Sequence, residues 1–155
     1  MRRLPLFALI AALIAALGAC SLPTADKQSD ADARQLYDEI RTGADLSKDA
    51  NLAEELKTPQ RLSELAAVKS LLPPGAPTKV ENRSWSYNST TDGALATLVH
   101  AYIYQGHTVL AETVLRKGPG AKTWTIAGFH VTLDHPPGQE EGNPVTVTGP
   151  PGEKT

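Results

Sequence analysis

The second half of the chain carries the side chains best suited to acid–base chemistry. His100, Tyr102 and Tyr104 alternate along an apolar stretch, so in a strand they would point to one face. His130 lies on a later stretch of the same kind, and Glu112 stands among apolar neighbours. Imidazole, phenol and carboxyl groups that line a pocket can act as general acids, general bases or hydrogen-bond donors. With Trp124, these residues are the candidate ligand-binding set.

Each candidate also has a structural interpretation, which the sequence favours. Strand tyrosines and histidines such as Tyr102 and His100 more often pack in a core, with the polar tip hydrogen-bonded. Glu112 could be a buried base with a raised pKa, but pairing with a basic side chain or a solvated sheet edge is the better interpretation. No catalytic residue is therefore assigned.

The four histidines do not form a metal-binding pattern. His100, His107, His130 and His135 lack ligand spacing, because His107 falls in a predicted turn and His135 opens a proline-rich tail. The chain also has no glycine-rich phosphate loop and no nucleophile elbow. We expect no metal and no cofactor, and most nucleotide and hydrolase chemistries are excluded.

The single cysteine follows an apolar run near the start of the chain. Residues 4–17 are apolar and come directly after Arg2 and Arg3. A run of this length is too short to span roughly 30 Å of hydrocarbon as a permanent helix, and it fits an export signal. A lone cysteine in an exported chain cannot form an internal disulfide, so Cys20 needs another explanation.

Leu17-Gly18-Ala19-Cys20 resembles the lipobox of bacterial lipoproteins. The resemblance implies that residues 1–19 are a signal peptide, that lipid such as palmitate is attached to the Cys20 sulfur, and that the chain is cut just before it. Two or more acyl chains make a stable membrane anchor. Ser21 after the cysteine implies an outer-membrane location facing the periplasm. The alternative is ordinary signal cleavage, with Cys20 left as a free thiol.

Charge excludes one class of partner. Without Arg2 and Arg3, 13 basic side chains face 17 acidic ones, so the exported chain is acidic overall. A nucleic-acid-binding protein would need a basic face. We expect contact with the membrane through Cys20 and no contact with nucleic acid.

The first folded element expected is a helix over residues 30–42. Residues 20–29 have no apolar periodicity and indicate a lipidated cysteine followed by a flexible tether. Ser29 or Asp30 can cap the helix, and Gly43 is placed to end it.

A second helix is expected after a short helix or turn within residues 46–56. Thr58 supplies an N-cap and Pro59 the first helical position. One apolar stripe follows at helical spacing, made of Leu62, Leu65, Val68 and Leu72.

The period then changes to two, which predicts four antiparallel strands joined by short turns. The expected strands are residues 80–90, 94–104, 108–117 and 122–133. Residues 134–155 are rich in proline and glycine, which predicts a disordered tail. The alternative for Val145-Thr146-Val147 is a short addition to a sheet edge. The fold class is therefore α+β, with one domain over residues 30–133.

A two-residue turn at Gln105-Gly106 sets the predicted register. It places Tyr104 opposite His107 and His100 opposite Ala111, and a similar turn after Lys117 places Ala111 opposite Gly128. One predicted face then holds Leu98, His100, Tyr102, Tyr104, Val109, Ala111, Leu115, Trp124, Ile126 and His130. The other holds Val99, Ala101, Ile103, Leu110, Glu112, Val114, Ala127 and Phe129. Neither face is plainly polar, so we expect the helices to cover one and a partner, a ligand or the sheet's own curvature to cover the other.

This order of helices and then a meander, ending in residues 124–131, resembles the cystatin-like cone of nuclear transport factor 2 and ketosteroid isomerase. The resemblance covers residues 30–133 and implies helices packed on a curved sheet. Enzymes of that superfamily place Asp, Tyr or His in the cone, but none of their catalytic motifs maps onto this chain.

Three functions remain open. The leading hypothesis is a non-enzymatic envelope lipoprotein that binds a protein partner or forms a homodimer through a sheet face. The alternatives are a carrier of a small apolar ligand and an isomerase- or dehydratase-like enzyme. A closed cavity with His100 and Tyr102 pointing inward would favour the alternatives, whereas a flat apolar sheet face would favour the first.

Overall fold

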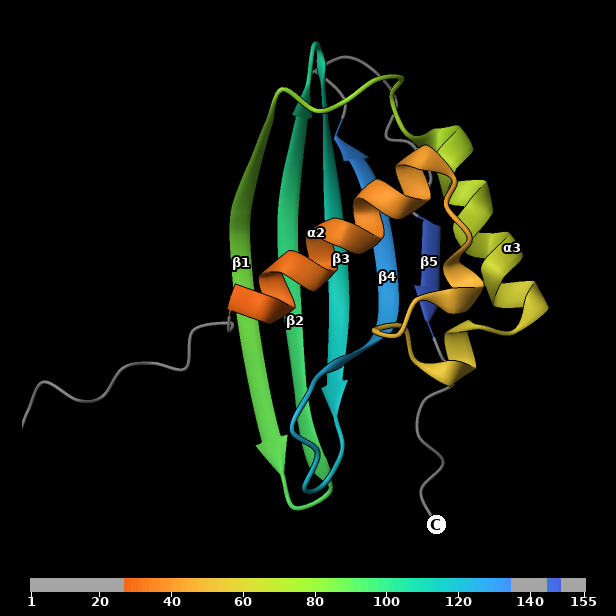
Figure 1. The fold of residues 1–155 in the computed structure, drawn as a ribbon. Helices are drawn as coiled ribbons and strands as arrows, with labels where there is room; N and C mark the ends of the chain where they lie inside the picture. The colour runs from red at the N-terminus through yellow and green to blue at the C-terminus, as the bar shows by residue number, and fades with distance from the viewer. Residues whose placement is uncertain (1–26, 135–144, 149–155) are drawn as a thin grey trace, which may run out of the picture.

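The computed structural model describes residues 27–134 and 145–148, so the predicted signal, Cys20 and the first part of the tether lie outside it. Within these ranges the chain forms two α-helices and a five-stranded antiparallel sheet in the order β1-β2-β3-β4-β5 (Figure 1). The helices lie on one face of the sheet, which confirms the α+β class. None of the helices in this part of the chain has the length and apolar character needed to cross a bilayer.

Helix α2 (Lys27–Thr42) buries one apolar stripe against the sheet. Ala33, Leu36, Tyr37 and Ile40 recur at helical spacing and are at most 2% exposed. Gly43, at φ 79°, ends the helix as predicted, with its N–H 2.9 Å from the Glu39 carbonyl.

The start of α2 differs from the prediction, because Lys27, Gln28 and Ser29 are helical and not part of the tether. Gln28 donates a hydrogen bond of 2.7 Å to Asp32, one turn further along the helix. The side chain of Ser29 is buried as well. Local hydrogen bonds and burial thus extend the helix beyond its apolar stripe.

The segment after α2 forms two 3-10 turns, η2 (Leu46–Lys48) and η3 (Glu54–Leu56). Helix α3 (Pro59–Val68) follows, and the Thr58 hydroxyl accepts a hydrogen bond from the Arg61 N–H as predicted. The last predicted turn is instead a 3-10 helix, η4 (Lys69–Leu71).

Four long strands form the predicted meander: β1 (Lys79–Thr90), β2 (Gly93–Tyr104), β3 (His107–Lys117) and β4 (Thr125–Asp134). Tyr104 pairs with His107 and His100 with Ala111, so the predicted β2–β3 register is confirmed. The predicted β3–β4 register is wrong, because Ala111 pairs with Val131 and not with Gly128.

Two features cause this difference in register. The connection between β3 and β4 is longer than a tight turn, and β4 carries a bulge where Leu115 pairs with Ile126 but Val114 pairs with Gly128. The bulge inserts one extra residue, and therefore reverses the faces of everything after it. Phe129 moves to the helix-covered face and is 1% exposed, whereas His130 moves to the opposite face.

The predicted disordered tail contains a fifth strand, β5 (Val145–Thr148). It pairs with β4 from Val131 opposite Val145 to Gly128 opposite Thr148, so the prediction of disorder is wrong for these residues. Alternating valine and threonine suit a strand, and β4 offers an unpaired edge. Asp134, the first residue of the predicted tail, belongs to β4, and residues 135–144 and 149–155 lie outside the described residues.

One hydrophobic core lies between the helices and the sheet. Its largest fully buried side chains on the sheet are Leu98, Tyr102, Leu115, Ile126 and Phe129. The other face of the sheet has no described helix over it.

Candidate functional site

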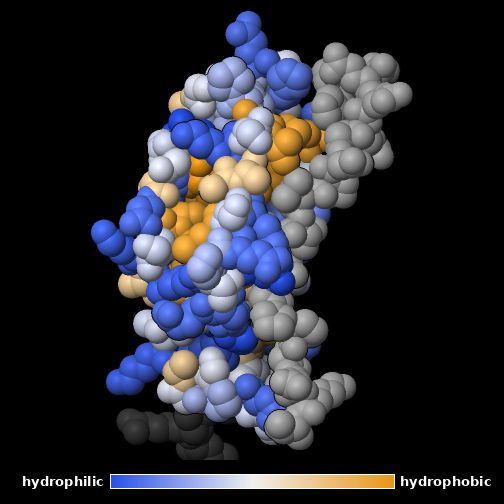
Figure 2. All heavy atoms as spheres, turned by 90° about the vertical axis from the view of Figure 1, so that its right-hand side faces the viewer, coloured by the Kyte–Doolittle hydropathy of each residue, from blue (hydrophilic) through white to orange (hydrophobic). Residues whose placement is uncertain are grey.

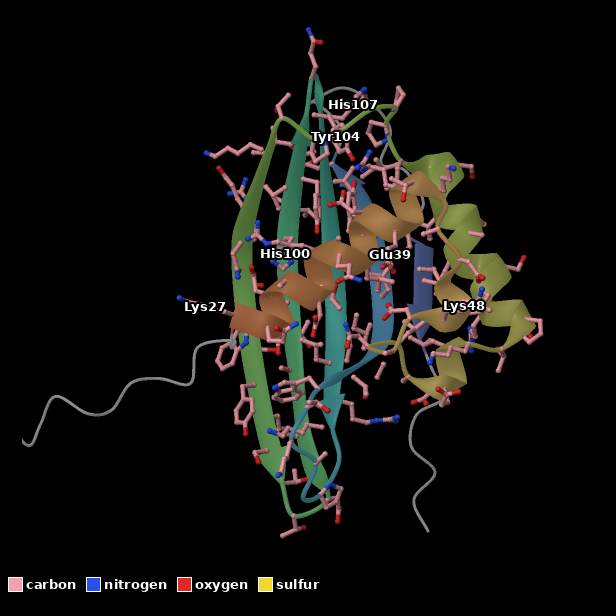
Figure 3. The ribbon with its side chains drawn as sticks, in the orientation of Figure 1. Lys27, Glu39, Lys48, His100, Tyr104 and His107 are labelled. Atoms are coloured by element: carbon pink, nitrogen blue, oxygen red, sulfur yellow. The ribbon has the colours of Figure 1, made fainter. Side chains whose placement is uncertain are left out.

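His100 lies beneath the first turns of α2 (Figure 3). Its side chain is 1% exposed, and its Nε2 is 2.7 Å from Oδ1 of Asp30. Asp30 also accepts a hydrogen bond of 2.8 Å from Arg34, and Asn82 donates one of 3.4 Å from β1. This polar cluster ties the beginning of α2 to β1 and β2.

The Asp30 carboxylate is stabilised in its charged form. Partial burial raises the pKa of Asp30, but the hydrogen bond with His100 and the positive charge of Arg34 outweigh that effect, so the pKa lies below its usual value. Asp30 therefore stays ionised under ordinary conditions and acts as the fixed partner of His100.

Tyr102 and Tyr104 pack against Tyr37 of α2. The rings of Tyr37 and Tyr102 are stacked with their centroids 3.4 Å apart, and the hydroxyls of Tyr37 and Tyr104 are 2.9 Å apart. Burial raises the pKa of both Tyr37 and Tyr102 far above the usual value. Tyr37 and Tyr102 are therefore neutral packing groups at physiological pH, so the packing expected of Tyr102 is observed but the hydrogen bond expected for its hydroxyl is not, within the described residues.

The Tyr102 hydroxyl is buried and has no hydrogen-bond partner in the part of the chain that the structure describes. One unpaired buried hydroxyl costs stability, on the order of 1–3 kcal/mol. Among the predicted site residues within the described ranges, it is the one buried polar side-chain atom without a hydrogen-bond partner.

Glu112 and His130 do not join this cluster. They are directly opposite each other on β3 and β4, half-buried, on the face without helices. His130 Nε2 is 3.1 Å from the Thr132 hydroxyl. The structure thus divides the predicted set, with His100, Tyr102 and Tyr104 on the covered face and Glu112 and His130 on the other.

Trp124 belongs to a separate group, which we call the aromatic corner: Trp85, Tyr87 and Trp124. The rings of Trp85 and Tyr87 stack at 5.8 Å, and Trp124 meets Tyr87 edge-on at 6.2 Å. The Lys117 ammonium lies 5.8 Å from the centre of the Trp124 ring. Sequence reasoning missed this corner because a pattern on one strand does not tell which loop residue folds back onto it.

A hollow of about 190 Å³ lies between the end of α2, η2 and α3. Ile40, Leu46, Leu62 and Ala66 supply its apolar lining and Lys69 a basic group, but none of the predicted site residues lines it. Figure 2, which faces the α3 side, shows hydrophobic atoms gathered within a hydrophilic rim. The hollow therefore offers no acid–base pair from the predicted set.

The face of the sheet opposite the helices, here called the open face, carries apolar side chains. Val99, Ile103, Leu110 and Val114 are half-buried, and Leu95 is 49% exposed. Antiparallel sheets with one solvated face usually alternate cleanly between apolar and polar residues. The predicted apolarity of this face is confirmed, and no described helix or strand covers it.

Among the described residues no group of three or more His, Cys, Asp or Glu side chains could hold a metal ion. Comparisons with known proteins add no family: no family model, curated protein or solved structure matches this chain.

Proposed function

We propose that this chain is a lipid-anchored protein of the bacterial cell envelope, on the outer membrane facing the periplasm. In this proposal the α+β domain is a non-enzymatic module that binds an envelope protein or a second copy of itself through the open face. The anchor is supported by the apolar run ending in Leu17-Gly18-Ala19-Cys20. The helix-then-meander order supports the further proposal of a cystatin-like cone.

The open face is the observation that carries the binding proposal. In a two-layer α+β domain the helices cover one face and water solvates the other, so the second face is normally polar. Here β2 and β3 instead present Val99, Ile103, Leu110 and Val114, with Leu95 at the margin. Partly exposed apolar side chains that share one face in this way are typical of protein interfaces.

The alternative functions require a closed, mostly apolar cavity into which His100 and Tyr102 point. Those side chains are instead occupied, since His100 bonds to Asp30 and Tyr102 stacks on Tyr37. The hollow beside α3 lies elsewhere. The packing therefore favours the binding module over a carrier or an isomerase-like enzyme.

The test is site-specific photo-crosslinking in membranes of the native host. A photoreactive residue replaces Leu110 on the open face, and the matched control replaces Gln60, which is exposed on α3. We expect a discrete protein adduct from position 110 and none of the same mass from position 60. No adduct at position 110, or the same adducts at both positions, would remove the support for the open face. The mass of the mature chain checks the acyl groups on Cys20 independently.

A further inference from the structure

We infer that the aromatic corner is a second contact between this domain and the membrane, acting on the lipid surface beside the anchor. The inference rests on the proposed lipidation of Cys20, which would hold the domain close to a membrane. The partner proposed for the aromatic corner is the headgroup region of a lipid bilayer.

The corner lies on the helix side of the sheet but outside the area that α2 covers. Asn82 on β1 contacts Asp30 in the first turn of α2. Trp85 and Tyr87 follow along β1, where they pair with buried residues of β2. Figure 1 shows α2 crossing β1 near its middle and rising toward β4, so the arrow end of β1 has no helix over it.

The side chains of the corner have the chemistry of an interfacial surface. Tyr87 is 43% exposed, whereas Trp85 and Trp124 are half-buried against the hydrophobic core and the indole nitrogen of Trp85 is buried. Tryptophan and tyrosine concentrate at membrane–water interfaces, because each ring has an apolar body and a polar edge. The Lys117 ammonium lies over the Trp124 ring. Lys122 is exposed in the connection between β3 and β4, which also contains Trp124. Each such lysine strengthens binding to an anionic surface roughly fivefold.

The position of the anchor favours a membrane over other partners. Helix α2 begins at Lys27, so six residues, 21–26, separate it from Cys20, and the seven residue steps span at most roughly 25 Å. Five strand residues lead from Asn82 to Tyr87, a distance of roughly 16 Å. Figure 3 shows Lys27 on the β1 side, directed away from the sheet. A lipid on Cys20 therefore keeps the corner within reach of the headgroups.

The short tether also makes a weak affinity sufficient. A linker of this length gives an effective concentration on the order of millimolar, so a contact too weak to hold a free protein would still be occupied. The corner lies on the helix side of the sheet, opposite the open face, so docking leaves the open face accessible.

The chain contains only two tryptophans, Trp85 and Trp124, and both belong to the corner. Intrinsic tryptophan fluorescence therefore reports on this surface alone. The experiment uses a chain beginning at Ser21, which keeps every described residue and lacks the acylation site. It is mixed with vesicles of phosphatidylethanolamine and phosphatidylglycerol, and with the same vesicles carrying brominated acyl chains. We expect a blue shift of the emission and quenching by bromine.

Variants separate the corner from other surfaces. Tyr87→Ser should weaken vesicle binding roughly thirtyfold, since the exposed part of the tyrosine side chain amounts to on the order of 80 Å². Lys117→Gln should weaken it roughly fivefold, on anionic vesicles only. The matched control, Leu95→Ser, removes an exposed apolar side chain from the open face and should leave vesicle binding unchanged.

Three results would overturn the inference. One is unchanged emission at millimolar lipid, and another is sedimentation with vesicles without blue shift or quenching, which would mean that another surface binds. The third is a shift caused by soluble cell-wall glycan but not by vesicles, which would make the corner a glycan site. Because this chain lacks Cys20, these results do not depend on lipidation. If the proposed function is wrong, other experiments show it: the mass of the mature chain lacks the acyl groups, or photo-crosslinking from position 110 gives no protein adduct.

Discussion

The same substitution on the two faces of β3 should separate stability from association. Leu115 faces the helices and is 1% exposed, whereas Leu110 is half-buried on the open face. Leu115→Ala leaves a cavity in the core and should cost about 3 kcal/mol. Leu110→Ala removes a side chain that is already partly in water, so its cost should be about 1 kcal/mol. For a domain of this size these costs lower the thermal midpoint by about 12 °C and about 4 °C.

Thermal melts of the chain without Cys20 measure the difference in stability between the two variants, and sedimentation measures the difference in association. Leu110→Ala should weaken self-association or partner binding, whereas Leu115→Ala should leave the association of the folded fraction unchanged. If Leu110→Ala lowers the midpoint as much as Leu115→Ala and no oligomer or partner is ever detected, position 110 is ordinary core. The interpretation of the open face as a binding surface would then be wrong.

Three further predictions concern the anchor, the polar cluster and the fifth strand. Cys20→Ala should move the protein out of the membrane fraction after a high-salt wash, and a chain that stays there is anchored elsewhere. Asp30→Asn should cost about 1–2 kcal/mol near neutral pH. The lowered pKa of Asp30 makes its contribution present above its usual pKa and lost as the pH falls through the lowered value. Melts of the variant and the parent chain should therefore converge in acid, and a constant difference would contradict this role. A chain ending at Asp134 loses β5 and should melt several degrees lower, and an unchanged midpoint would mean that β5 adds nothing.

Sequence periodicity was sufficient to predict the secondary-structure elements that are determined by neighbouring residues. The helices, the four long strands and the tight turn before His107 follow from apolar spacing and turn residues, and each is observed. The capping of α3 by Thr58 was predictable for the same reason. Local signals of this kind do not depend on how distant segments meet.

The β3–β4 register could not be predicted, because it depends on the length of the connection and on one bulged residue. Gly128 inside the strand pattern is compatible with a bulge, but a single glycine does not show that a residue is inserted or where. Because the side chains of a strand alternate, that residue exchanges the faces of Phe129 and His130. The predicted pocket containing both His100 and His130 was lost for this reason alone.

Contacts between residues far apart in the sequence could not be predicted either. Asp30 was assigned only a capping role, since no local pattern links it to a histidine 70 residues later. The strand at Val145 was the weaker alternative, because composition argued for disorder and the free edge of β4 was not known. Tertiary context decided both cases.

Alkylation of a single introduced thiol tests the open face most directly. Leu95 on that face and Leu71 on η4 have similar exposures of 49% and 41%, and the chain has only one cysteine of its own, Cys20. With Cys20 acylated, Leu95→Cys or Leu71→Cys supplies the one reactive thiol. If a protein covers the open face in the envelope, the thiol at position 95 should react at least roughly tenfold more slowly in native membranes than in purified protein. The thiol at position 71 should react equally fast in both. Equal rates at position 95 in membranes and in purified protein would contradict the proposal.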